Sequence, residues 1–228
     1  MDTSQMKFTN KNPNCWYKEV CTLDNPCNIC VKYTEMSYLM ENSNLPKAKQ
    51  RVITLTAPDC DRNAYRRLAE IKSNIYDFVQ DGKSLYLGSR FTGNGKTSWA
   101  IKMMHKYFEE VWDGNGLRER ALFIHVPTFL MRCKEFGVKN EEFQHLKNLL
   151  MTIDLVVWDD IASTDMSSYD YAQIMPYIDN RCLSELSNIY TGNFDNRETL
   201  ADKLGERLAS RIWSKSTEII IFNSGDIR

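Results

Sequence analysis

The chain has 228 residues, of which 43% are hydrophobic, 26% charged and 11% aromatic. This composition is typical of a soluble globular protein and excludes a disordered, collagen-like or coiled-coil chain. Lysine and arginine number 29 against 30 aspartate and glutamate residues, for a net charge of -1, which excludes a protein that wraps nucleic acid with a wholly basic surface.

The expected compartment of the protein determines how its N-terminal cysteines are interpreted. The sequence has no apolar run of about 18 residues and no secretory signal, so we expect a cytoplasmic protein without membrane contact. In a reducing compartment, clustered cysteines hold metal more often than disulfides. We predict a small zinc module over residues 1–42, with isolated reduced cysteines as the alternative. Its metal ligands are Cys15, Cys21, Cys27 and Cys30.

Residues 43–61 contain two prolines and no sustained periodicity, which predicts a linker. After Asp61, apolar residues recur at three- and four-residue steps, typical of a helix that Asp61 caps and that buries Tyr65, Leu68, Ile71, Ile75 and Phe78. Helix-length segments then separate short apolar runs at residues 84–88, 121–126, 154–159, 187–193 and 217–223. This alternation predicts an α/β domain over residues 62–228 with five parallel core strands.

A glycine-rich loop follows the first predicted strand and opens a helix. Its glycines let backbone N–H groups point at phosphate oxygens, while Lys96 reaches the β- and γ-phosphates and Thr97 binds Mg²⁺. Arg90 stands where the P-loop pattern expects glycine, and a chance surface turn is the alternative. We predict a nucleotide site formed by Gly93, Asn94, Gly95, Lys96, Thr97 and Ser98.

Polar residues end the third and fourth predicted strands. Asp159 is predicted to bind Mg²⁺ through water and Asp160 to polarise the attacking water, with a helix cap as the alternative. Asn193 can hydrogen-bond that water or the γ-phosphate. Further along, Arg207 and Arg211 lie four apart on one predicted helix face. An exposed arginine there can reach the γ-phosphate of a neighbouring subunit, although a solvated, ion-paired helix is the alternative.

The segments GNGKTSWA, LVVWDDIA, YIDNR, TGN and LGERLASRI together resemble the bacterial and phage replicative helicase loaders, the DnaC/DnaI group of AAA+ ATPases. The resemblance covers residues 62–228. It implies an ATPase that binds ATP or ADP with Mg²⁺ and self-associates, and an AAA+ core without a C-terminal lid. It also implies that Asn193 is sensor 1, that Arg211 is the arginine finger beside Arg207, and that Arg181 lies near the subunit boundary.

Such loaders grip single-stranded DNA with an extra helix between the two phosphate-site motifs and with a loop after the second. The resemblance therefore implies DNA contacts from Arg132, Lys134, Phe136, Ser167 and Tyr169. Lysine and arginine can meet backbone phosphates while aromatic rings stack on bases. For Phe129, Leu130 and Phe136, a place in the hydrophobic core is the alternative.

The resemblance implies an ATP-dependent loader that binds a hexameric DnaB-type helicase through the zinc module and deposits it on single-stranded DNA during replication initiation. Aspartate at position 160, where many AAA+ proteins have glutamate, suggests slow hydrolysis. The alternatives are an IstB-like transposition regulator, a small-molecule P-loop kinase, and a zinc-bearing adaptor that no longer binds ATP.

Overall fold

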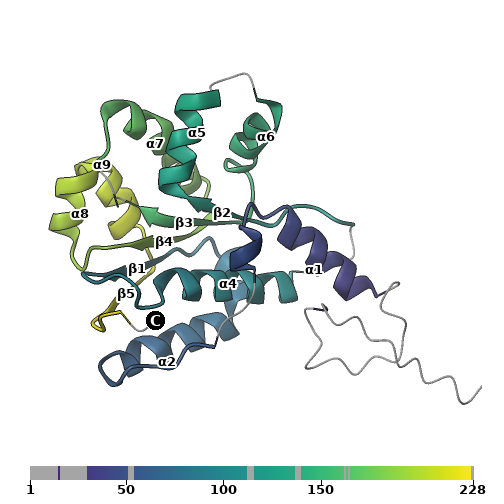
Figure 1. The fold of residues 1–228 in the computed structure, drawn as a ribbon, viewed down its shortest axis with the longest axis horizontal. Coiled ribbons are helices and arrows are strands. Elements are labelled where there is room, and N and C mark those ends of the chain that lie inside the picture. The colour runs from purple at the N-terminus through teal and green to yellow at the C-terminus, as the bar shows by residue number, and fades with distance from the viewer. Residues whose placement is uncertain are drawn as a thin grey trace, which may run out of the picture.

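The computed structural model describes Cys15 and residues 30–50, 54–111, 116–136, 140–161, 163 and 165–226. A central parallel sheet lies between two layers of helices (Figure 1). In the described residues its strands are β1 (Leu85–Ser89), β2 (Ala121–His125), β3 (Leu155–Ile161), β4 (Ser187–Gly192) and β5 (Glu218–Phe222). Their order across the sheet is β2-β3-β4-β1-β5, and every neighbouring pair is parallel. The predicted α/β class and five-stranded sheet are confirmed.

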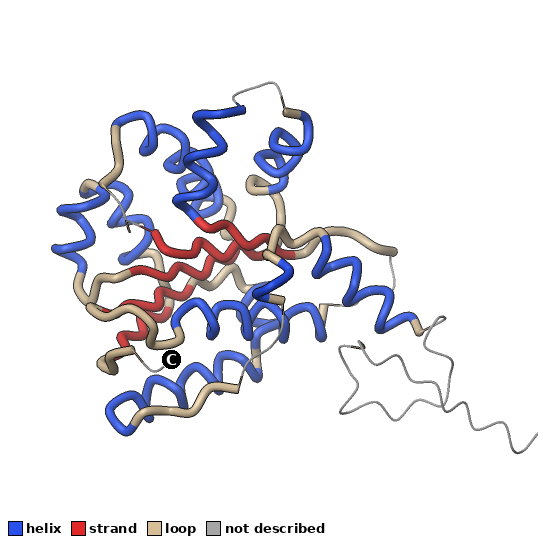
Figure 2. The backbone as a smooth tube through the Cα atoms, viewed as in Figure 1, coloured by secondary structure: helices blue, strands red, loops and turns tan. Residues whose placement is uncertain are grey.

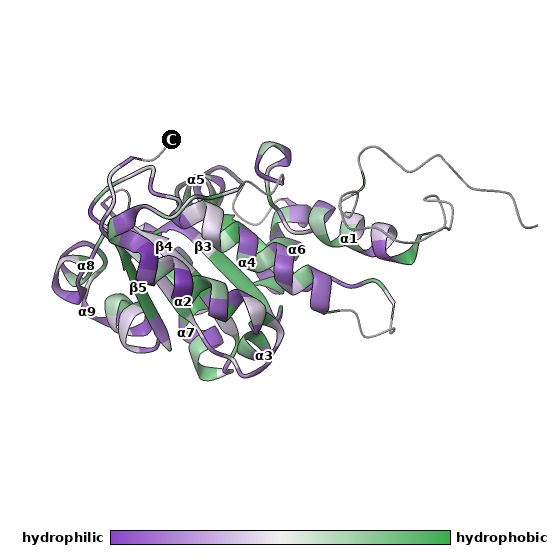
Figure 3. Ribbon diagram, turned by 90° about the horizontal axis from the view of Figure 1, so that it is seen from below, coloured by the Kyte–Doolittle hydropathy of each residue, from purple (hydrophilic) through white to green (hydrophobic). Residues whose placement is uncertain are grey.

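Each face of the sheet has its own hydrophobic cluster, because successive side chains of a strand point to opposite faces. Leu85 and Leu87 pack on one side with α1 (Val31–Glu41), α2 (Arg62–Ser73), α3 (Ile75–Gln80) and α4 (Lys96–Glu110). Tyr86 packs on the other with α5 (Val126–Phe136), α6 (Glu141–Leu149), α7 (Ser168–Leu183), α8 (Arg197–Leu204) and α9 (Glu206–Ala209). Figure 2 shows the strands enclosed between these layers, and hydrophobic residues gather toward them in Figure 3.

The helix predicted after Asp61 is divided at Asn74 into α2 and α3, and its five apolar residues are buried as expected. The predicted cap is wrong, because the Asp61 side chain makes no capping hydrogen bond to α2. Its carboxylate instead accepts hydrogen bonds from the backbone N–H groups of Asn223 (2.7 Å) and Ser224 (3.1 Å). Asp61 therefore joins the start of α2 to the chain that follows β5.

The end of the predicted zinc module forms helix α1, which does not stand apart from the core. Met36, Leu39 and Met40 are buried in the same cluster as α4. The next residues also pack on the sheet, since Phe123 donates its backbone N–H to the Ser43 carbonyl (2.7 Å) and accepts from Asn44 (2.9 Å). The predicted boundary at residue 42 and the first part of the linker are thus corrected.

Two of the four predicted zinc ligands, Cys21 and Cys27, lie outside the described residues. Within the described ranges, no group of three or more histidine, cysteine, aspartate or glutamate side chains is placed to hold a metal ion. The zinc site therefore stays a prediction. None of the helices in those ranges is long and apolar enough to span a membrane.

Candidate nucleotide site

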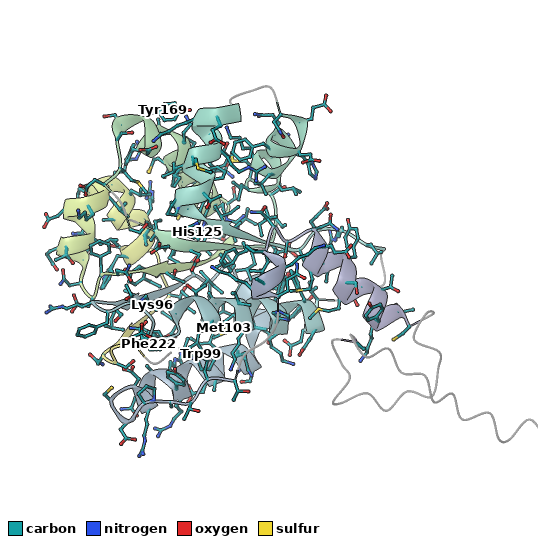
Figure 4. The ribbon with its side chains drawn as sticks, viewed as in Figure 1. Lys96, Trp99, Met103, His125, Tyr169 and Phe222 are labelled. Carbon is teal, nitrogen blue, oxygen red and sulfur yellow. The ribbon has the colours of Figure 1, made fainter. Side chains whose placement is uncertain are left out.

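A cavity of about 900 Å³ opens at the carboxyl ends of the strands. Ligands of parallel α/β sheets bind at this edge, where the loops after several strands converge. The structure brings most of the predicted nucleotide residues into its wall: Gly93, Gly95, Lys96, Thr97, Ser98, Asp159, Asp160 and Asn193. Figure 4 labels Lys96 at the start of α4 and His125, another lining residue, at the end of β2.

The glycine loop has the backbone shape that its sequence requires. Gly93 (φ 74°) and Gly95 (φ 91°) lie in the left-handed region, which costs glycine little and other residues much more. A Cβ placed on Gly93 would lie 2.3 Å from the carboxylate of Asp226, so a side chain at this position would also displace that aspartate. The fifteen-residue helix α4 begins directly after the loop, and its N-terminus gives the cavity a positive potential.

Lys96 is buried, and its Nζ donates to the Phe91 carbonyl (2.8 Å) and to the Asn94 side chain (2.9 Å). Burial lowers the pKa of Lys96 to about 8, although Asp160 and Asp159 oppose that shift. A bound phosphate would favour the charged ammonium. The lysine is therefore placed to gain an anionic partner.

The side chain of Asn94 supports the glycine loop from behind, whereas the prediction for this loop concerned its backbone N–H groups. It is 1% exposed and donates to the Ser89 hydroxyl (2.5 Å) and to the Ser224 carbonyl (3.3 Å). These contacts join the glycine loop to β1 and to the chain after β5. The Asn94 side chain thus braces the loop and does not line the cavity.

Arg90, the departure from the P-loop pattern, points away from the cavity. Its guanidinium forms an ion pair with Asp195 (2.5 Å), in the loop after β4. Arg90 is not among the residues that line the cavity. The side chain that replaces the expected glycine is thus accommodated outside the candidate nucleotide site.

Asp159 is the centre of the predicted Mg²⁺ site and is 2% exposed. Its Oδ1 accepts hydrogen bonds from the hydroxyls of Thr97 (2.6 Å) and Thr191 (2.9 Å). Carboxylate and hydroxyl oxygens are ligands that suit Mg²⁺, which keeps several of its own waters. Thr97 and Asp159 are therefore together, as predicted. Thr191 was not predicted, and its only signal is its place at the end of the fourth strand.

Asp160 adopts an unusual backbone conformation, with φ of 61°. The pairing of β3 with β4 shifts register between Trp158 and Ile161, and such irregularities redirect side chains at functional sites. The Asp160 N–H donates to the Thr191 hydroxyl (2.9 Å), and its carboxylate lies 3.9 Å from Nε2 of His125. His125 was also missed by sequence reasoning, because an isolated histidine at a strand end gives no specific signal.

Part of the predicted linker forms another wall of the cavity. Leu55, Ala57 and Pro58 line it together with Ile101 of α4. Small-molecule sites combine apolar walls with a few polar groups. The cavity thus combines the predicted phosphate site with an apolar side, and no sequence motif indicated the second.

Arg207 and Arg211 share one carboxylate outside the cavity. Arg211 donates to Asp179 Oδ1 (2.6 Å), and Arg207 donates to Asp179 Oδ2 (2.7 Å). The hydrogen bond from Arg211, supported by Arg207, lowers the pKa of Asp179. Glu206, which directly precedes Arg207, pairs with Arg197. The single chain therefore holds both arginines together, away from its own nucleotide cavity.

Arg181 does not line the nucleotide cavity and has no exposed surface in the single chain, so the role predicted for it is not supported. It is fully buried, and its guanidinium donates to the carbonyls of Ile153 (2.8 Å) and Ser187 (2.5 Å) and to the Asn188 side chain. These groups lie at the amino ends of β3 and β4, the edge opposite the cavity. Arg181 satisfies buried backbone carbonyls there.

The structure brings together three of the predicted DNA-contacting residues, where the end of α5 meets the start of α7. Tyr169 is 46% exposed and donates to the Cys133 carbonyl (3.0 Å). Lys134 forms an ion pair with Asp170 (2.8 Å), and Ser167 caps α7 in a capping box with that aspartate. Tyr169 lies well away from Lys96 (Figure 4).

The other two predicted DNA contacts are not part of this group. The Arg132 guanidinium lies over the ring of Phe143, 4.6 Å from its centroid, on the side of α6. The Phe136 side chain lies outside the described part of the chain. Phe129 and Leu130 of the same helix are buried, so the core alternative is confirmed for them.

The parallel sheet, the glycine loop before α4 and the two aspartates at the end of β3 have the arrangement expected of a P-loop site. No protein-family model and no curated protein matches the chain. Among solved structures, it is similar to the DnaC helicase loader, with a TM-score of 0.64 and 21% identity over 78% of this chain and 100% of the other. DnaI aligns with a TM-score of 0.60 and 20% identity over 81% and 94% of the two chains.

A third similar structure is a putative primosome component from Streptococcus pyogenes serotype M3. Its TM-score is 0.60, and it is 22% identical over 84% of this chain and 98% of the other. The chain therefore has the α/β fold of these three structures, and the parallel five-stranded core implied by the motif resemblance is confirmed.

Proposed function

We propose that the chain is an ATP-dependent loader that assembles with a DnaB-type helicase hexamer and deposits it on single-stranded DNA in the cytoplasm of a bacterial or phage-infected cell. The observation that carries this proposal is the cavity in which Lys96, Thr97, Asp159 and Asp160 converge, within a loader-like fold. In this proposal, self-association brings Arg211 of one subunit to the nucleotide site of its neighbour.

Each side chain has a defined task in this proposal. When bound, Mg²⁺ would supply positive charge that neutralises and polarises the phosphates. Thr97 and Asp159 would hold the ion, and Lys96 would contact the β- and γ-phosphates. Asp160 and Asn193 orient the attacking water. Phosphoryl transfer depends mainly on positioning and charge stabilisation. Because one subunit supplies the water-binding aspartate and its neighbour supplies the arginine, hydrolysis requires assembly.

The N-terminal residues are proposed to dock the helicase, and the packing of α1 decides how this is tested. A deletion of residues 1–42 would remove the core side chains Met36, Leu39 and Met40, so the informative deletion is 1–29. We expect that deletion to abolish co-elution with the host's DnaB-type helicase in size-exclusion chromatography while binding of a fluorescent ATP analogue persists.

Full capture of the helicase by the shortened chain would contradict that assignment. The intact chain is the matched control, and a pull-down from its native host extends the test. Recovery of a replicative helicase supports the loader, whereas recovery of a transposase supports the IstB-like alternative. Hydrolysis that is independent of any oligomer would instead favour a small-molecule kinase.

A zinc ion held by Cys15, Cys21, Cys27 and Cys30 is proposed to stabilise the docking segment. Cys30 directly precedes α1, and its carbonyl accepts from the Thr34 N–H (3.0 Å). We expect metal analysis to find one zinc per chain, and we expect it to be absent from the Cys27→Ser, Cys30→Ser double variant. Cys60→Ser, at an exposed position before α2, is the control. A metal-free wild type that retains full helicase capture would refute the site.

The surface formed by Lys134, Ser167 and Tyr169 is proposed to contact single-stranded DNA. We expect salt-sensitive binding that strengthens with ATP, because phosphate contacts release counterions and subunits align only in the assembly. Tyr169→Ala is expected to weaken binding about tenfold, since base stacking contributes about 1–3 kcal/mol. Fluorescence anisotropy across a salt series measures this.

Tyr76→Ala is the matched control for Tyr169→Ala, since Tyr76 is a comparably exposed tyrosine on α3. Equal losses in the two variants would remove Tyr169 from the interface. A preference for duplex DNA at every salt concentration would favour the transposition regulator.

A further inference from the structure

A lysine from the predicted linker reaches into the candidate nucleotide site. Lys49 ends the 3-10 turn Lys47–Lys49 and lines the cavity. Its Nζ lies 3.5 Å from Oδ2 of Asp159. The other oxygen, Oδ1, accepts from Thr97 and Thr191. The ammonium therefore faces the oxygen of the buried carboxylate that the two threonines leave open.

The position of Lys49 is set by contacts on both sides of the turn. Ser43 and Asn44 hydrogen-bond the backbone of Phe123 in β2, and Gln50 donates to the Leu45 carbonyl (3.1 Å). The Lys49 Nζ also lies 5.2 Å from the centroid of the Phe123 ring, a cation–π distance. An anchored turn loses little further entropy when its lysine side chain stays at Asp159.

We propose that Lys49 is a tethered cation that competes with Mg²⁺ for Asp159, so that it sets the Mg²⁺ concentration at which the site accepts nucleotide. This inference rests on the proposed ATP site. Without a divalent ion, the ammonium compensates the buried carboxylate, which would otherwise be costly. When Mg²⁺ approaches with nucleotide, the two cations repel each other and Lys49 must leave Asp159.

The Lys49 side chain has space to move away from Asp159. It is 41% exposed, and it also lines a second cavity of about 340 Å³ beside Asn44, Pro46 and Thr128. Displacement therefore needs a change of side-chain rotamer and leaves the anchored turn in place. Since the pair is partly exposed, its effect on Mg²⁺ binding is expected to be modest, about two- to fivefold.

The test measures binding of a fluorescent ATP analogue across a Mg²⁺ titration. Lys49→Met is expected to lower the half-saturating Mg²⁺ concentration about two- to fivefold, and Lys49→Arg to keep the wild-type value. Lys47→Met, in the same turn but outside the cavity wall, is the matched control. Thermal unfolding of each variant shows that the fold is retained.

An unchanged Mg²⁺ midpoint in folded Lys49→Met would overturn the inference. So would weaker ATP binding at saturating Mg²⁺, because Lys49 would then be a phosphate ligand. Failure of the wild type to bind nucleotide at any Mg²⁺ concentration is a different result, since it refutes the proposed function itself and the inference with it.

Discussion

Replacing Lys96 by alanine is expected to weaken ATP binding about 10- to 100-fold, because hydrogen bonds to charged groups contribute about 1.5–3 kcal/mol each. Asp160→Asn is expected to retain binding and to lower hydrolysis about 10²- to 10⁴-fold, the usual contribution of a group that acts on the attacking water. Equilibrium binding of a fluorescent ATP analogue and single-turnover hydrolysis separate the two effects.

Lys106→Ala is the control for Lys96→Ala, since Lys106 lies on the same helix and pairs with Glu110 (2.9 Å). Wild-type affinity in Lys96→Ala would refute the phosphate site. Loss of nucleotide binding in Asp160→Asn would show that this aspartate holds the ion or the loop and not the water.

The depressed pKa of Lys96 adds a pH dependence to the same measurement. Free Lys96 has a pKa of about 8 because of burial, and a bound phosphate raises it. The affinity for ATP is therefore expected to be highest below about pH 8, where Lys96 is protonated, and to fall as the pH rises above that value. Lys96→Arg stays charged over this range and is expected to lose the slope. A flat profile for the wild type would indicate that the lysine does not contact the phosphates.

Arg211→Ala is expected to bind ATP normally as a single chain and to lose hydrolysis in the assembly. An arginine supplied across a subunit interface contributes about 10³- to 10⁵-fold to phosphoryl transfer, and in the single chain Arg211 is held by Asp179 outside the cavity. Steady-state hydrolysis with helicase and DNA present measures the loss.

Mixed assemblies give the sharper test. Asp160→Asn subunits keep Arg211, and Arg211→Ala subunits keep Asp160, so each interface that combines them correctly regains activity. Arg211→Lys keeps the charge but not the planar fork of donors, and we expect it to remain impaired. No recovery in proven mixed assemblies would exclude a finger at this position, and the pair with Asp179 would then be structural.

The sheet and the phosphate loop could be predicted because their signals are local. Each strand is a continuous apolar run, since both faces of a parallel sheet are covered, and the structure places all five within a few residues of the predicted ranges. The loop motif likewise combines a strand, two glycines and a helix start within a dozen residues. Lys96, Thr97 and Asp159 therefore meet as expected.

The remaining features depend on partners far away in the chain. Asp61 precedes a helix, as a capping residue does, yet it binds the backbone of Asn223 and Ser224. Arg181 matched a family pattern, but its partners are buried carbonyls at the wrong edge of the sheet. The proline-interrupted segment 43–61 gave no sign of packing on β2 or lining the cavity, because neither role requires a local period.

The topology of the sheet also determines when this chain becomes able to hold nucleotide during synthesis. β1, which precedes the glycine loop, pairs with β4 and β5, whose partner residues for Leu85 are Ile189 and Glu218, so both strands are translated long after β1. The bonds from Asn94 to Ser224 and from Asp61 to the same segment close the loop's surroundings last. Such long-range pairings form slowly because a large loop must close first. On the ribosome, the surroundings of the glycine motif are therefore expected to form only after β5 has emerged.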